Sequence, residues 1–95
     1  MTQAQARSEI ERATALNPSF AQAHFQLGVI YDQEKMTPQA IREYEWTVRL
    51  NPASASAHYR LAQDYFRSGA AVKGNSELQV YEKLRHSGSG KSVSK

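Results

Sequence analysis

The sequence predicts an all-α fold, an α-solenoid in which five helices stack as antiparallel pairs. A motif returns after 34 residues, because seven of the eighteen positions from 17 to 34 are identical at that offset. A period of this length is typical of stacked helix-turn-helix arrays. Apolar residues recur at three- and four-residue steps, whereas no segment shows the alternation typical of strands. The identical pairs are Asn17/Asn51, Pro18/Pro52, Ala21/Ala55, Ala23/Ala57, His24/His58, Leu27/Leu61 and Tyr31/Tyr65.

The first helix is expected over residues 3–16, with Thr2 as a candidate N-cap. It ends at Asn17-Pro18, because the residue before a proline avoids helical angles. The second helix is expected from about residue 20 to 34, with Ser19 as its cap. The inner faces of these helices are expected to hold Ala6, Ile10, Ala13, Ala23, Leu27, Ile30 and Tyr31.

The third helix is expected to start at Thr37-Pro38 and to end at Asn51-Pro52. Threonine is a good N-cap, and proline at the first helical position loses no needed donor. The fourth helix spans about residues 54–67. The inner faces of these two helices are expected to hold Ala40, Ile41, Tyr44, Thr47, Val48, Ala57, Leu61, Ala62 and Tyr65.

Gly69 separates the fourth helix from a fifth over about residues 71–85, because glycine tolerates the positive φ of a helix stop. Leu78, Tyr81 and Leu84 face inward in this last helix. A chain of 95 residues makes one small domain. Its expected units are a half repeat over 1–18, a full repeat over 19–52, a second repeat with a closing helix over 53–86, and a flexible Ser/Gly-rich tail over 87–95.

Charges balance over most of the chain. Residues 1–68 hold seven Lys/Arg and seven Asp/Glu, whereas residues 69–95 hold five and two, so the whole excess of +3 lies at the C-terminal end. We therefore expect no nucleic-acid partner, since such binding needs basic side chains along one face. The chain has no cysteine, no apolar run as long as a membrane span and no secretory signal. These features predict a cytoplasmic protein with no membrane partner.

The repeat also has a recognisable residue pattern. The first copy offers His24, Leu27-Gly28, Tyr31, Ala40, Tyr44 and Pro52, and the second offers His58, Leu61-Ala62, Tyr65, Gly74 and Leu78. This pattern resembles the tetratricopeptide repeat over residues 3–86, about two and a half units. The resemblance implies a superhelix with a concave groove and a noncatalytic function in binding a protein or peptide. Histidine in place of a bulky apolar residue, and Tyr81 in place of a small one, depart from the family; Tyr81 suggests that the fifth helix closes the stack.

The resemblance places twelve residues on the concave surface. They are Gln22, Phe25, Gln26, Val29, Asp32, Gln33, Ser56, Tyr59, Arg60, Gln63, Phe66 and Arg67. Phe25, Tyr59 and Phe66 are aromatic anchors of the kind that dominate interfaces. Arg60 and Arg67 lie one heptad apart and suit partner carboxylates, so the expected partner carries apolar and acidic side chains. The alternative is that the aromatic residues only pack along neighbouring helices and that Arg60 pairs with Asp64.

Trp46 and Val80 share a repeat phase that places them on the outer face. An exposed apolar patch there indicates a contact surface. The alternative is that Trp46 lies flat on its own helix with Arg42 or Arg49 against its ring. The rival function is therefore structural: a homo-oligomer formed through this patch or through the half-repeat end.

Catalytic chemistry is not expected. His24 and His58 lie on inward stripes without a third ligand at matching spacing, so we interpret them as hydrogen-bonded core residues and expect no metal. Glu43 and Glu45 are assigned to exposed faces, which argues against paired acid-base catalysis. Gly90-Lys91-Ser92 is not a phosphate-binding loop, because Arg85 stands where that motif needs glycine. We therefore predict no enzyme activity and no cofactor.

Overall fold

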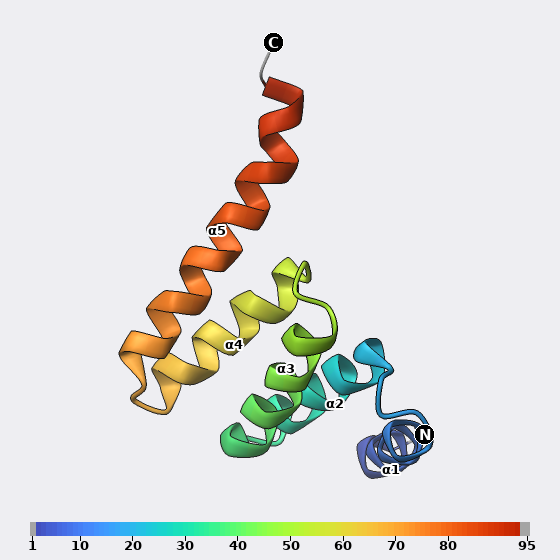
Figure 1. Cartoon of the computed structure of the whole chain (residues 1–95). Coiled ribbons are helices and arrows are strands. Elements are labelled where there is room, and N and C mark those ends of the chain that lie inside the picture. Colours follow the sequence, from blue (N-terminus) through green and yellow to red (C-terminus); the bar gives the residue numbers. More distant parts are fainter. Residues whose placement is uncertain (1, 94–95) are drawn as a thin grey trace.

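The computed structural model describes the backbone of residues 2–93 and side chains through residue 87. The described residues form five helices and no strand, which confirms the all-α solenoid (Figure 1). Each helix packs mainly on its neighbours in the sequence, and the chain advances from α1 at one end to α5 at the other. The helices are α1 (Gln3–Leu16), α2 (Ala21–Gln33), α3 (Thr37–Leu50), α4 (Ala55–Arg67) and α5 (Ala71–Val93).

The helix starts correct two predicted caps. Thr2 caps α1 as expected, and its hydroxyl accepts from the Gln5 N–H in a full capping box. Ser19 does not cap α2, because Phe20 occupies the N-cap position without a side-chain bond. Thr37 is already the first residue of α3, and Met36 precedes it as N-cap. The turn between α2 and α3 closes through a positive φ of 63° at Lys35, which the sequence pattern did not reveal.

The end of α5 was also predicted wrongly. The helix was expected to stop near residue 85, yet its backbone stays helical to Val93 and covers much of the segment assigned to a flexible tail. Glycine weakens a helix by only about 1 kcal/mol per position, whereas proline breaks it, and this segment contains no proline. The Ser/Gly-rich composition of residues 87–93 therefore did not determine the conformation of their backbone. Gly69, in contrast, takes the expected positive φ of 89° before α5.

The core lies where α3 and α4 meet. Ala40, Tyr44 and Leu61 are buried there, and Tyr65 lies almost buried beside them. The ring of Tyr44 presses on the backbone of Gly28, where an added Cβ would lie 2.5 Å from Cε1 of the ring. A side chain at this position in α2 would displace the largest buried ring, which explains why the first repeat carries glycine here.

Two identical polar contacts join the turns to the helices. The ring of His24 is buried with Nδ1 2.8 Å from Glu43 Oε1 and Nε2 2.8 Å from the Pro18 carbonyl oxygen. The same geometry returns one period later, where His58 bridges Glu77 and the Pro52 carbonyl. The histidines are thus hydrogen-bonded core residues, as expected.

The two carboxylates assigned to exposed faces of α3 are half-buried and bonded instead. Glu43 holds the His24 ring, and Glu45 accepts a short hydrogen bond from the Tyr65 hydroxyl of α4. Their sequence phase was read as outward, but hydrogen-bonding side chains from α2 and α4 cover them. These two residues therefore hold adjacent helices together.

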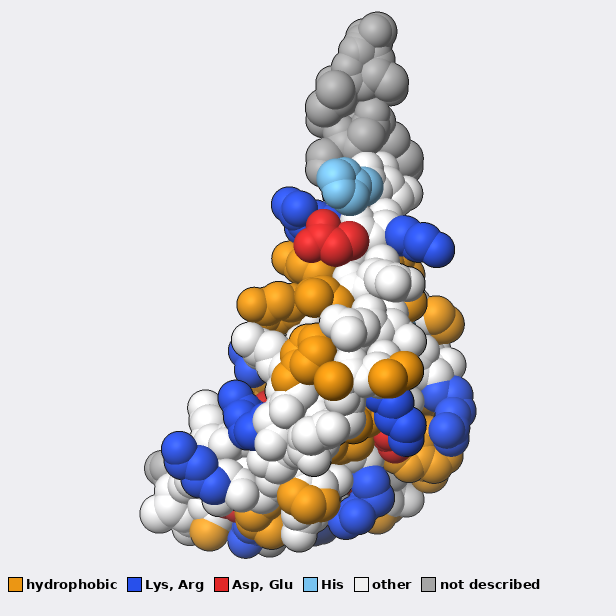
Figure 2. All heavy atoms as spheres, turned by 90° about the vertical axis from the view of Figure 1, so that its left-hand side faces the viewer, with side chains coloured by type: hydrophobic (Ala, Val, Ile, Leu, Met, Phe, Trp, Pro, Cys, Tyr) orange, Lys and Arg blue, Asp and Glu red, His pale blue; other side chains and the backbone are white. Residues whose placement is uncertain are grey.

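None of the helices described over residues 2–93 is long and apolar enough to cross a membrane. On the face shown in Figure 2, Lys and Arg side chains are scattered among hydrophobic and uncharged ones and form no continuous basic stripe.

Candidate functional site

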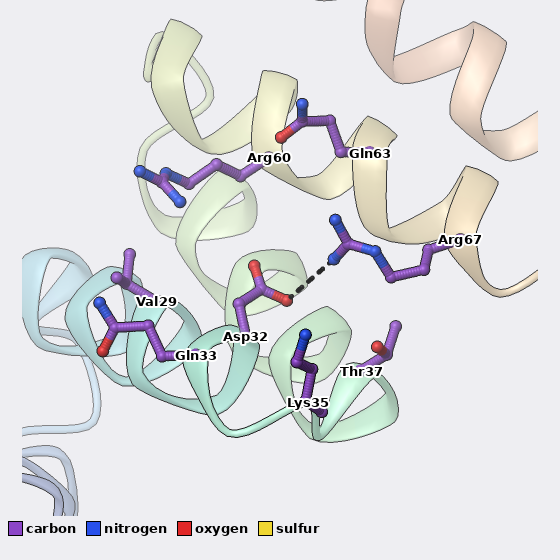
Figure 3. A pocket seen from close by; sticks show the side chains of 8 residues that line it. All are labelled: Val29, Asp32, Gln33, Lys35, Thr37, Arg60, Gln63 and Arg67. Carbon is purple, nitrogen blue, oxygen red and sulfur yellow. Dashed lines mark ion pairs between the residues drawn. The ribbon is translucent and has the colours of Figure 1, made fainter. Parts of the chain in front are cut away.

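A hollow of about 370 Å³ opens between α2 and α4. Figure 3 shows side chains from α2, α4 and the α2–α3 turn pointing toward one another around it. α3 connects the two helices, so the hollow spans the boundary between the two repeats. Its lining consists of Val29, Asp32, Gln33, Lys35, Thr37, Arg60, Gln63 and Arg67. Six of these eight residues belong to the predicted groove, and we refer to this site as the central hollow.

Five of the six remaining predicted groove residues lie around smaller hollows on the same helices. Gln22, Phe25 and Gln26 line one of about 350 Å³ beside α1, and Ser56 and Tyr59 line one of about 290 Å³ beside α5. Lys35 and Thr37 were not among the predicted groove residues, because that prediction covered only the first helix of each repeat. Both residues follow directly after α2, and this position in the sequence could have indicated that they lie beside the groove.

Phe66 is the one predicted groove residue that lines none of these hollows. Its ring lies against Gly74 of α5, where an added Cβ would come within 2.8 Å of Cε1. The ring is nevertheless 41% exposed. Phe66 therefore packs along a neighbouring helix, as the structural alternative stated, and still presents a face to solvent.

The other two aromatic residues combine packing with exposure. Phe25 is half-buried, and the centroid of its ring lies 5.8 Å from that of Tyr44 and 5.8 Å from the guanidinium carbon of Arg60. Tyr59 is 41% exposed and packs on Tyr81 with a ring separation of 4.9 Å. Packing of this kind fixes the rings in place and lowers the entropy lost when a partner contacts them.

Two carboxylates form the floor next to the central hollow. Asp64 is fully buried, and its Oδ1 accepts from Arg67 Nη1 at 2.7 Å. Asp32 Oδ2 accepts from the Tyr44 hydroxyl at 2.9 Å, and its Oδ1 lies 3.7 Å from the same Arg67 nitrogen (Figure 3). Asp64 therefore pairs with Arg67 and not with Arg60, which corrects the alternative drawn from the four-residue spacing.

The pKa of Asp64 is raised from 3.8 to about 7, first by burial and then by the hydrogen bond and negative charge of Asp32. The positive charges of Arg67 and Arg60 act in the opposite direction. Burial and the bond to Asp32 also raise the pKa of Tyr44 above its usual range, so this hydroxyl remains a donor. Three cationic side chains, Lys35, Arg60 and Arg67, line the hollow beside these carboxylates.

The outer face differs in character. Trp46 is 43% exposed, and its ring stacks on His24 with a centroid separation of 5.6 Å and an interplanar angle of 16°. The Arg49 guanidinium lies 5.1 Å from the Trp46 centroid, as the alternative interpretation of this residue expected. Val80 is half-buried on α5. A contact patch that uses both residues stays a prediction.

Within the described part of the chain, no group of three or more His, Cys, Asp or Glu side chains is placed to hold a metal ion. The central hollow offers guanidinium, ammonium and amide donors around a carboxylate floor. This arrangement provides hydrogen bonds and charge pairs for recognition.

Stacked antiparallel helix hairpins with a concave, polar and aromatic surface define a helical-repeat protein of the interaction type. The chain belongs to the tetratricopeptide repeat family, which matches residues 4–41 and 31–84. Members of this family are typically noncatalytic modules that bind other proteins, and the fold of this chain supports a protein-interaction module. No curated protein sequence matches it.

Solved structures share the fold. A crystal structure of MamA superposes with a TM-score of 0.87 at 24% identity over 93% of this chain and 52% of that one. MamA from Desulfovibrio magneticus RS-1 gives 0.83 at 22% identity over 90% and 48%. The Yersinia enterocolitica type III secretion translocator chaperone SycD gives 0.82 at 15% identity over 86% and 57%. The chain spans about half the length of these structures.

Proposed function

We propose that the concave face binds an acidic segment of a partner protein, with the central hollow as the main contact. One observation carries the proposal: three cationic side chains surround an open hollow, and two exposed aromatic rings, Tyr59 and Phe66, lie on the helix that forms its wall. A structurally similar protein, SycD, is described as a secretion translocator chaperone, which fits a protein partner.

The arginines suit this function because they are partly free. The Arg67 side chain is 58% exposed although it contacts Asp64, so it can turn toward an incoming carboxylate and form a bidentate bond. Arg60 lies over the Phe25 ring, which holds its guanidinium near the hollow. Acidic side chains of the partner would reach these groups while its apolar side chains contact the rings.

The test is selection of binding peptides from a displayed random library, followed by affinity measurements with the full chain. We expect the selected peptides to be rich in Asp or Glu and apolar residues. Arg67→Glu should weaken them at least about tenfold, since it reverses a charge at the contact. Arg42→Glu makes the same charge change at an exposed position of α3 and is the matched control. Equal affinity of both variants and wild type would refute the groove as the binding surface.

Self-association is the second candidate function. It is favoured by three exposed apolar side chains outside the groove: Trp46, which is 43% exposed, Leu16 at 82% and Phe20 at 46%. Sedimentation equilibrium of wild type and Trp46→Ala tests it. A concentration-dependent mass that Trp46→Ala reduces would favour an oligomer through the outer face. A monomer at every concentration would refute self-association.

A further inference from the structure

The buried carboxylates beside the central hollow leave two oxygen atoms unsatisfied. Asp64 Oδ2 and Asp32 Oδ1 are both buried and have no hydrogen-bond partner. Their other oxygens are used, since Asp64 Oδ1 accepts from Arg67 and Asp32 Oδ2 accepts from Tyr44. A buried carboxylate oxygen without a donor destabilises the folded state, so the arrangement is incomplete when both groups are anions.

A single proton completes it. Asp32 and Asp64 both contact the same nitrogen, Arg67 Nη1, with oxygens at 3.7 Å and 2.7 Å, so their carboxylates lie close together. When one of them is protonated, its hydroxyl donates to the other, and both unsatisfied oxygens gain a partner. The raised pKa of Asp64, about 7, agrees with a proton held near neutrality. Because the two groups interact strongly, that proton belongs to the pair.

The pair links two repeats. Asp32 is near the end of α2 and Asp64 near the end of α4, so the shared proton would join the concave helices of adjacent hairpins. Lys73 of α5 is directed to a different group, because its Nζ lies 5.7 Å from the centroid of the Tyr65 ring. The charged and titratable groups that face the pair are Tyr44 from α3, Arg60 and Arg67 from α4, and Lys35 from the α2–α3 turn across the hollow.

Arg67 connects the pair to the hollow. It is the cation closest to both carboxylates, at 2.7 Å from Asp64 and 3.7 Å from Asp32, yet more than half of its side chain is exposed. A carboxylate that enters the hollow competes for this guanidinium. Once Arg67 turns toward it, the pair loses the charge that favoured its ionised form.

We propose that Asp32 and Asp64 share one proton across the repeat boundary, and that an acidic side chain bound at Arg67 makes this pair take up a proton. The second part rests on the proposed function, whereas the first concerns the free protein alone. Binding is then linked to pH: the deprotonated pair retains Arg67, so an acidic partner binds less tightly as pH rises.

The first experiment follows the carboxyl carbon shifts of Asp32 and Asp64 by NMR from about pH 4 to about pH 9 in the free protein. We expect one step near neutral pH that both residues report. Arg67→Gln should move this step upward, because it removes the nearest positive charge, whereas Arg42→Gln at an exposed site should leave it in place. Asp64→Asn should abolish it. Independent titration of both residues below about pH 5 would overturn the shared proton.

The second experiment measures binding of a hexaglutamate peptide, with hexaglutamine as control, in buffers of different ionisation enthalpy. We expect net proton uptake, with a dissociation constant that increases by up to about tenfold per pH unit above the neutral step. Asp64→Asn should bind without this uptake. Binding without proton uptake in the wild type would overturn the linkage alone. No binding of hexaglutamate, with the neutral step intact, would overturn the linkage and the acidic partner of the proposed function but retain the shared proton.

Discussion

Replacing Asp64 by asparagine should change how stability depends on pH. Asparagine is isosteric, stays neutral at every pH, and its amide can donate to Asp32 as a protonated carboxyl would. Asp64 has a folded-state pKa of about 7 against an ordinary value of 3.8. A raised pKa contributes stability that is fully present below about pH 3.8 and is lost as pH rises toward about 7. Wild type should therefore lose stability relative to the variant across this interval.

The magnitude follows from the same two pKa values. They differ by about three pKa units, and each corresponds to about 1.4 kcal/mol, so the difference in unfolding free energy between wild type and Asp64→Asn changes by at most about 4 kcal/mol over the interval. A typical domain is stabilised by only about 5–15 kcal/mol, so a change of this size is large enough to measure. Above about pH 7 the variant should be the more stable protein.

Urea unfolding monitored by far-UV circular dichroism, at several pH values between about 4 and 8, measures this difference. Glu9→Gln on the exposed surface of α1 is the control for removing one carboxylate. It should leave the pH profile of wild type nearly unchanged. The reasoning is refuted if wild type and Asp64→Asn have parallel profiles, or if wild type gains stability relative to the variant as pH rises.

Three core substitutions provide further predictions. Gly28→Ala should lower the free energy of unfolding by about 1–3 kcal/mol in urea titrations, because the new Cβ meets the buried ring of Tyr44. In Gly74→Ala the new Cβ meets only the half-exposed ring of Phe66, which can turn away. The gain in helix propensity of about 1 kcal/mol should therefore leave the free energy of unfolding equal or higher. An equal loss of unfolding free energy in Gly28→Ala and Gly74→Ala would contradict this reasoning. Leu61→Ala removes a side chain that is 1% exposed and should cost about 2–5 kcal/mol, seen as a lower melting temperature; an unchanged melting temperature would place the core elsewhere.

The fold could be predicted because the 34-residue period, the proline pairs and Gly69 each set local structure independently. The carboxylate floor of the candidate site, formed by Asp32 and Asp64 together, could not be predicted in this way. Asp64 stands one period after Ile30, at a buried phase, but the four-residue spacing suggested only that it pairs with Arg60. Only the three-dimensional neighbours, Asp32 and Arg67, make its burial understandable.

The glutamate partners of the two histidines were not predicted, although the sequence contained the signal. Glu43 and Glu77 are 34 residues apart, and each follows its histidine by 19 residues. The repeat comparison stopped at residue 34 and so did not include them. The caps of α2 and α3 failed for a different reason: a one-residue shift in a turn depends on backbone angles such as the positive φ of Lys35, which side-chain type does not determine.

The hydrogen-bonded junctions at His24 and His58 set the curvature of the helix stack, whereas other residues line the central hollow. Each one fixes how a hairpin leaves its predecessor, and its three members lie in a turn, in the following helix and in the helix after that. None of them belongs to the lining of the central hollow. Residues that line the central hollow can therefore be substituted, in evolution or by design, to bind a different partner while the superhelical pitch stays constant.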